Sequence, residues 1–279
     1  MREIALPSTR ANAASSGKAR VHSCMGPFSA VWLTVCPTSV AMSIANPQLQ
    51  CAIRRRLGIA VNFSGDAHGH NCLTDNTGAR LNARHDTLLA SWRQVLVEAG
   101  GNVPDRNVER MMHDTNVPVA PGDMRRLDLI VTGLNVHRGL PLFCDVTVLT
   151  PLSATGEPRG GTSNQGGSLL EHATAENNGT YIEVIDSGLG HLLCLGSEVY
   201  GRWSTQCVDL VPALARERCR GLHPRIRRGA ALSLQHRWWG LLGIGLQKAV
   251  AHAVFNPQAG ADLVHTQLEP TPPLANIIF

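Results

Sequence analysis

Apolar residues recur along the chain at spacings that predict two long helices and a pair of buried strands. In residues 82–101 the apolar positions fall on one stripe at helical spacing: Leu88, Trp92, Val95, Leu96 and Ala99. A second stripe runs through residues 228–255: Trp239, Leu242, Leu246, Ala249 and Ala253. Residues 125–153 instead hold two apolar runs with a turn around residues 135–139, which is typical of a β-hairpin.

Shorter elements complete the predicted order. We expect helices over 46–60, 168–181 and 205–220, a strand within 189–203, and polar loops over 62–72 and 156–167. The order helix, strand, strand, helix, strand, helix, helix predicts an α/β fold. In it, a small mixed sheet with a central antiparallel hairpin is flanked by helices.

The chain divides into four predicted parts: residues 1–45, disordered or outside the folded protein; 46–80, a linker; 81–256, the core; and 257–279, a loose tail. Residues 28–45 are apolar, but Pro37 interrupts them, so we expect no membrane span there. The alternatives are a poorly determined gene start or a segment packed on the core. The first 20 residues are rich in Arg, Ala and Ser and contain one acid, Glu3, so they faintly resemble a transit peptide.

Charge and cysteine usage narrow the functional classes. The formal net charge is +4, which permits a polyanionic partner without requiring one. Only Lys18 and Lys248 among the 25 Lys and Arg residues are lysine, so chemistry that needs a lysine has few candidates. The eight cysteines are irregularly spaced and several lie in apolar runs, as expected for reduced cysteines of a nuclear or cytoplasmic protein.

The two apolar runs of residues 125–153 each contain an aspartate. If the hairpin is centred between Val136 and His137, Asp128 lies directly across from Asp145. Opposed residues have Cβ atoms about 4.5–5.5 Å apart, so two carboxylates there repel each other. A divalent cation reverses this effect, because carboxylate oxygens then become ligands. The alternative is that one aspartate caps a turn or pairs with Arg125 or Arg126.

Two further segments have both a chemical and a structural interpretation. Cys51, His68, His70 and Cys72 have the residue types of a zinc site, although their crowded spacing also suits a metal-free loop. Near the predicted start of helix 82–101, an acid next to His85 favours the helix dipole. The alternative is that Arg84 and His85 face a phosphate.

The segment "RERCRGLHPRIRR" (216–228) is rich in arginine, which suits either phosphate contacts or a solvated helical turn. Trp238 and Trp239, farther along, fit core packing better than base stacking. The candidate nucleic-acid-binding residues are Arg84, His85, Arg125, Arg126, Arg225, Arg227 and Arg228.

The stretch "RRLDLIV…LPLFCDVTVLTPLS" resembles the Asp-strand-turn-strand-Asp element of PD-(D/E)xK restriction-like nucleases. More closely, it resembles the restriction-like endonuclease domain of non-LTR retrotransposon reverse transcriptase proteins. Residues 65–89, 195–203 and 234–254 are similar to other segments of that domain, in the same order. The resemblance covers roughly residues 51–255 and implies a truncated, partly degenerate copy.

This resemblance implies a restriction-endonuclease-like fold and a nicking DNA endonuclease. Mg²⁺ or Mn²⁺ would be held by Asp128, Asp145 and the carbonyl of Val146, and the Cys/His segment corresponds to one that binds zinc. A lysine normally follows the second acid by two residues, but here that position is Thr147, which can position a water. The partners implied are DNA and the RNA of a parent element, with no membrane and no small-molecule substrate.

Two other functions stay open at this point. The first is a catalytically inactive remnant of the same fold that binds nucleic acid through its arginines. The second is a metal-free structural or interaction domain. The sequence leaves the oligomeric state undetermined.

Overall fold

A computed structural model of the protein describes residues 6–61, 66–74, 78–104 and 110–255. The predicted tail 257–279 lies outside these ranges. The helices are α1 (Leu6–Cys24), α2 (Asn46–Leu57), α3 (His70–Thr74), α4 (Gly78–Glu98), α5 (Ser168–Thr180), α6 (Ile182–Ser187), α7 (Thr205–Arg218) and α8 (Pro224–Phe255). The strands are β1 (Arg110–Met111), β2 (Arg126–Leu127), β3 (Leu129–Val131), β4 (Leu142–Leu149) and β5 (His191–Glu198), and short 3₁₀ turns are η1 (Val31–Leu33), η2 (Met112–Asp114) and η3 (His137–Gly139).

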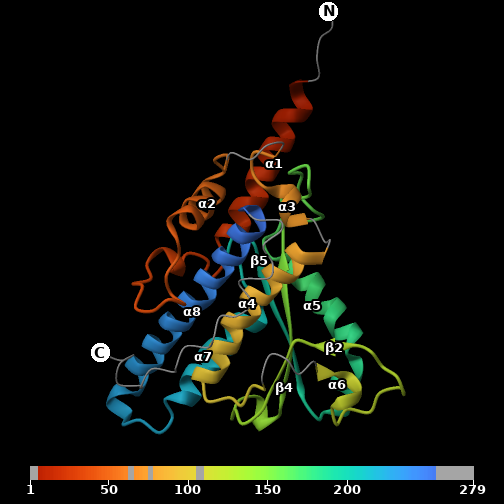
Figure 1. The fold of residues 1–279 in the computed structure, drawn as a ribbon, viewed down its shortest axis with the longest axis vertical. Coiled ribbons are helices and arrows are strands. Elements are labelled where there is room, and N and C mark those ends of the chain that lie inside the picture. Colours follow the sequence, from red (N-terminus) through yellow and green to blue (C-terminus); the bar gives the residue numbers. More distant parts are fainter. Residues whose placement is uncertain (1–5, 62–65, 75–77, 105–109, 256–279) are drawn as a thin grey trace, which may run out of the picture.

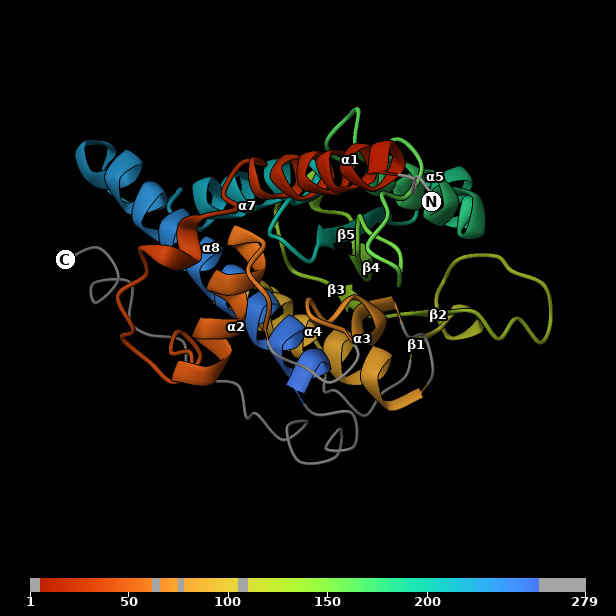
Figure 2. The same cartoon turned by 90° about the horizontal axis from the view of Figure 1, so that it is seen from above.

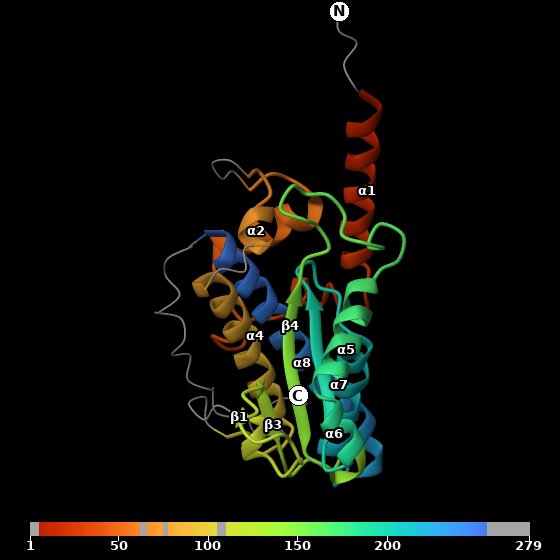
Figure 3. The same cartoon turned by 90° about the vertical axis from the view of Figure 1, so that its right-hand side faces the viewer.

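Helices cover both faces of the two long strands, β4 and β5 (Figure 1). Seen from above, α1, α5 and α7 lie on one side of these strands, and α2, α3 and α4 lie on the other (Figure 2). The side view shows the same layers, with α6 next to α5 (Figure 3). The predicted mixed α/β architecture is therefore confirmed.

The main sheet has three strands in the order β3-β4-β5. β3 and β4 are antiparallel, with Leu129 opposite Cys144 and Val131 opposite Leu142, so the predicted hairpin register is confirmed. β4 and β5 are parallel, and α5 and α6 form the crossover between them. β2 differs from the prediction, because it leaves this sheet and pairs with β1.

The core is built mainly where α4 and α8 pack together. The predicted stripe of α4 is fully buried at Leu88, Trp92, Val95 and Leu96. On α8, Trp238 and Trp239 are almost completely buried, which confirms their packing role. At the end of α4 the buried carboxylate of Glu98 is 2.7 Å from Arg237 Nη2 and accepts a 2.9 Å hydrogen bond from Trp238 Nε1, which ties the two helices together.

The described part of the N-terminal segment, residues 6–45, packs against the rest of the fold, which agrees with the alternative of a segment packed on the core for residues 28–45. Trp32 in η1 is 4% exposed and packs against α8 at Gly243, where an added Cβ would be 3.0 Å from the Trp32 Cβ. His22 at the end of α1 accepts hydrogen bonds from the Arg202 guanidinium through its carbonyl. Among the described residues, no helix combines the length and apolar character needed to cross a membrane.

Gly101 controls how closely the end of α4 approaches β3. A Cβ at this position would be 2.7 Å from Val131 Cγ1 and 2.9 Å from the Leu96 carbonyl oxygen. We expect Gly101→Ala to lower the free energy of unfolding by about 1–3 kcal/mol, because backbone or side chains must move apart. Gly229→Ala is the control, since nothing lies near its Cβ and alanine favours the helix. Urea unfolding measures both, and equal stability of the Gly101 variant and the wild type would contradict the tight approach.

Candidate active site

Asp128 lies at the bend between β2 and β3, where the chain passes from one sheet to the other. Its carboxylate oxygen Oδ2 accepts a 2.6 Å hydrogen bond from the backbone N–H of Val146 on β4. The same oxygen is 2.9 Å from Nε2 of His85 on α4. The side chain is 22% exposed, so solvent still reaches it. Asp128 therefore has partners that offset its desolvation, and they are neither Arg125 nor Arg126.

His85 lies between two carboxylates. Its Nδ1 is 3.3 Å from Asp86 Oδ1, and its Nε2 contacts Asp128. Burial lowers the pKa of His85, but the hydrogen bonds and charges of Asp128 and Asp86 outweigh burial and raise the pKa to about 10. The ring is therefore an imidazolium at neutral pH. The predicted capping role is wrong, because α4 begins at Gly78 and this pair lies beyond its first turn.

Asp145 projects from β4 toward α5. Burial, followed by the negative charge of Asp128, raises the pKa of Asp145 to about 6. The charge of His85 and a hydrogen bond from Asn177 on α5 act in the opposite direction. Because each of these groups affects Asp145, the two aspartates, His85 and Asn177 form one electrostatic cluster.

Three further side chains near Asp145, those of Thr147, Cys194 and Tyr181, are polar and uncharged. Thr147 lies two residues along β4 and shares the face of Asp145, with its methyl group toward Gly196 of β5. Burial raises the pKa of Cys194 to about 11, so this thiol is protonated at neutral pH. Burial and the charges of Asp145 and Asp128 raise the pKa of Tyr181 to about 12. Neither thiol nor phenol therefore supplies an anionic nucleophile.

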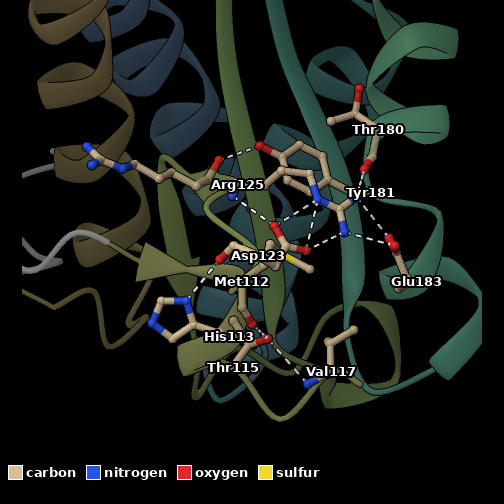
Figure 4. Close-up of polar contacts among 10 residues, drawn as sticks. Met112, His113, Thr115, Val117, Asp123, Arg125, Thr180, Tyr181 and Glu183 are labelled. Atoms are coloured by element: carbon tan, nitrogen blue, oxygen red, sulfur yellow. Dashed lines mark hydrogen bonds and ion pairs between the residues drawn. The ribbon is translucent and has the colours of Figure 1, made fainter. Parts of the chain in front are cut away.

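Arg125 is engaged by acids of the protein itself (Figure 4). Its Nη2 is 2.5 Å from Asp123 Oδ2 and 2.8 Å from Glu183 Oε1. The pKa of Glu183 is lowered by this guanidinium. Tyr181 also joins the network, since its hydroxyl donates to the Arg126 carbonyl. A phosphate would have to compete with two carboxylates for Arg125.

The other predicted nucleic-acid-binding residues are not gathered in one place. Arg84 is 3% exposed and donates to the Leu73 carbonyl at 2.7 Å, so its guanidinium is turned into the protein and its phosphate contact stays a prediction. Arg126 is exposed on β2. The exposed group Arg225, Arg227 and Arg228 begins α8, which Figures 1 and 2 place far from β2.

The predicted zinc segment is only partly assembled. The rings of His68 and His70 are 5.5 Å apart, whereas Cys51 lies in the hydrophobic core. Burial, followed by the charge of Arg55, lowers the pKa of His70 to about 4. Across the ranges the structure describes, no group of three or more His, Cys, Asp or Glu side chains is placed to hold a metal ion. Zinc binding by these residues and Cys72 stays a prediction.

Two contributions to the cluster were not predicted from the sequence. The first is the ion pair between His85 and Asp128, which joins α4 to the hairpin. The second is the hydrogen bond from Asn177, a residue of "AENNGT" at the position where a basic residue is expected from the resemblance. The polar Asn177-Asn178 pair within a helix was the available signal.

Comparisons with protein-family models, with curated proteins and with solved structures found no match for this chain. The cluster formed by Asp128, Asp145, His85 and Asn177 is therefore the feature of the structure from which a function can be inferred.

Proposed function

We propose that this protein is a Mg²⁺-dependent phosphodiester hydrolase that nicks DNA, of the restriction-like type that its sequence resembles. The observation that supports this most is the hairpin register. Continued one residue beyond β3, this register sets Asp128 opposite Asp145, and the Asp128 carboxylate contacts the N–H of Val146, the residue after Asp145. Two acids so placed are unfavourable unless a cation accompanies them.

The two carboxylates suit Mg²⁺ better than a metal ion that needs all of its ligands from protein side chains. Mg²⁺ is commonly bound through one or two carboxylates and keeps several water molecules. Asp128 and Asp145 would hold it, with the backbone carbonyl of Val146 as the further ligand implied by the resemblance. When bound, Mg²⁺ supplies positive charge at the scissile phosphate and lowers the pKa of a nearby water.

The protein's own side chains have distinct tasks in this proposal. Asn177 lies close enough to Asp145 to lower its pKa by hydrogen bonding and would help to hold its carboxylate in place. His85, protonated at neutral pH, fixes the Asp128 carboxylate and provides a positive charge. In related nucleases this charge comes from a lysine, and Thr147 cannot supply it. Thr147 instead offers a hydroxyl on the same face as Asp145 to position a water.

Nicking of supercoiled plasmid tests the proposal. Purified protein is incubated with Mg²⁺ or Mn²⁺, and the same reaction is repeated with EDTA. We expect open-circular product only with the divalent ion. A parallel preparation of Asp145→Ala reports contaminating nucleases, and equal nicking by this variant would contradict the proposal.

A second candidate function is nucleic-acid binding without cleavage. It is favoured by the ion pair of His85 with Asp128, which already neutralises one of the two acids. The exposed arginines at the start of α8, Arg225, Arg227 and Arg228, can then contact phosphates without serving catalysis.

Salt dependence distinguishes this second function. Replacing one arginine that binds a phosphate should reduce the slope of log affinity against log salt by about 1. We therefore expect the triple variant of Arg225, Arg227 and Arg228 to glutamine to lower that slope by up to about 3, measured by fluorescence anisotropy with a DNA duplex. Arg159→Gln, an exposed arginine in the loop after β4, is the control. An unchanged slope in the triple variant would place the DNA-binding surface elsewhere.

A further inference from the structure

A pocket of about 330 Å³ lies between α1, α2, the segment before α3 and the loop that follows β4. In Figures 1 and 3 this loop lies beside α1, at the opposite end of β4 from η3. Ser16 of α1 donates a 2.7 Å hydrogen bond to the Gly156 carbonyl and so closes one side. The pocket does not include Asp128, Asp145 or His85, so it is separate from the candidate active site.

The polar lining of this pocket is cationic. Arg20 and Arg55 line it together with His68 and His70, and its lining contains no acidic residue. Outside the lining, the charge of Asp66 acts on His70. The Asp66 carboxylate already accepts backbone N–H groups of His68 at 3.1 Å and Asn71 at 2.6 Å. The guanidinium groups of the buried Arg55 and the half-buried Arg20 therefore line the cavity with no carboxylate in the lining to balance them.

Several donors in this lining have no partner in the protein. Arg55 is only 3% exposed, yet its Nε and Nη2 atoms make no hydrogen bond. Arg20 Nε and His70 Nδ1 are also buried without a partner. Burying an unpaired guanidinium donor is costly, and such groups normally have a protein, water or ligand acceptor. Three of these nitrogens, Arg55 Nε, Arg55 Nη2 and Arg20 Nε, can only donate, so around one cavity they point to a missing acceptor.

The position of Arg55 is fixed by its surroundings. Its Nη1 donates to the His68 carbonyl, and its guanidinium carbon lies 5.2 Å from the centre of the Tyr200 ring. The remaining donors of the planar guanidinium form a fork that matches a phosphate or carboxylate in a bidentate manner. The fork is therefore ordered before any ligand binds, which reduces the entropic cost of binding.

We propose that this pocket binds a small phosphate monoester, with the phosphate held by Arg55 and Arg20. The volume exceeds what a phosphate group alone requires, and the walls at Leu152 and Tyr200 can accommodate a small organic group. The arginines beside the two histidines favour an anion over a metal cation at this position. This ligand class is absent from the sequence predictions, which expected no small-molecule substrate.

Isothermal titration with inorganic phosphate and with phenyl phosphate tests the proposal on the full chain. We expect saturable binding of both, with phenyl phosphate binding about tenfold more tightly because its ring buries apolar surface. Arg55→Gln should weaken phenyl phosphate binding by about tenfold or more, since charged hydrogen bonds are removed. Arg216→Gln makes the same charge change on an exposed residue of α7 outside the lining, and should leave affinity unchanged.

A second variant tests the pocket even if Arg55→Gln fails to fold. Gly17 lines the pocket on α1, and nothing lies within 4 Å of an added Cβ. Gly17→Leu should therefore occupy part of the cavity while favouring the helix, and should weaken phenyl phosphate binding by about tenfold with no loss of thermal stability. Gly179→Leu on α5 is its control, because that Cβ also meets nothing within 4 Å and lies outside the pocket.

Three results would overturn the proposal. One is the absence of saturable binding of either phosphate by the wild-type protein. Another is equal affinity for phenyl phosphate in Gly17→Leu and in the wild type. Binding of a DNA duplex through Arg55 without binding of phenyl phosphate would likewise reject a small-molecule site.

Discussion

Asp145→Asn should abolish metal-dependent nicking and at the same time make the folded protein more stable. Removing one of two carboxylate ligands takes away several kcal/mol of transition-state charge stabilisation. The nicking rate should therefore fall by about a thousandfold or more. Asparagine keeps the size of the side chain and its hydrogen-bonding capacity toward Asn177, so the local packing should be preserved.

The gain in stability follows from the pKa of Asp145. Its ordinary value is 3.8, and burial together with the charge of Asp128 raises it to about 6 in the folded protein. Because the folded state binds more protons than the unfolded state between these values, the carboxyl makes unfolding progressively easier as pH rises from about 4 to 6. Above pH 6, in metal-free buffer, Asp145→Asn should raise the free energy of unfolding by about 1–3 kcal/mol.

Denaturant unfolding with and without Mg²⁺ measures both effects. A ligand that binds only the folded state stabilises it, by about 2.7 kcal/mol at a hundred times its dissociation constant. Mg²⁺ should therefore stabilise the wild type but not Asp145→Asn. Asp186→Asn, an exposed aspartate on α6, is the matched control and should change neither quantity. Equal stabilisation of all three proteins by Mg²⁺ would show that the ion binds elsewhere.

The hairpin register was predictable because apolar runs and a short polar turn leave few pairings. Centring the turn between Val136 and His137 gives the observed pairing of Leu129 with Cys144. The end of α2 could also be predicted from the sequence, because glycine favours the left-handed conformation that Gly58 adopts at the C-cap (φ 73°). Residues close together in the sequence determine both the hairpin register and the end of α2, so both can be predicted from the sequence.

Features that depend on contacts between distant segments were not predictable in this way. β2 leaves the main sheet for β1, a strand of two residues that carries no alternating pattern. The bend that follows brings Asp128 to His85, which is far away in sequence and lies on a helix with its own apolar stripe. The helix α1 was not predicted because its sequence has no apolar stripe, and it is joined to distant segments by polar contacts such as those of Ser16 with Gly156 and of Arg202 with His22.

The ion pair between His85 and Asp128 should make stability depend on alkaline pH in metal-free buffer. The pKa of the His85 ring is 6.5 in its ordinary state and about 10 in the folded protein. A raised histidine pKa contributes stability that is fully present below 6.5 and is lost as pH rises through about 10. Without solvent screening, this increase in the pKa of His85 corresponds to about 4–5 kcal/mol in the free energy of unfolding. Because the His85 side chain is 28% exposed, solvent screening reduces this contribution to about 2–4 kcal/mol.

His85→Gln should therefore lower the free energy of unfolding by about 2–4 kcal/mol at pH 6.5 and by much less near pH 10. The two stability curves should converge between these values, as measured by urea unfolding across that range. His172→Gln is the control, because His172 also faces an acid at 3.4 Å but is 70% exposed, so its variant should follow the wild type. A constant difference between His85→Gln and the wild type at all pH values would mean that His85 acts through packing alone. In that case His85 would not supply the positive charge that the hydrolase proposal assigns to it in place of a lysine.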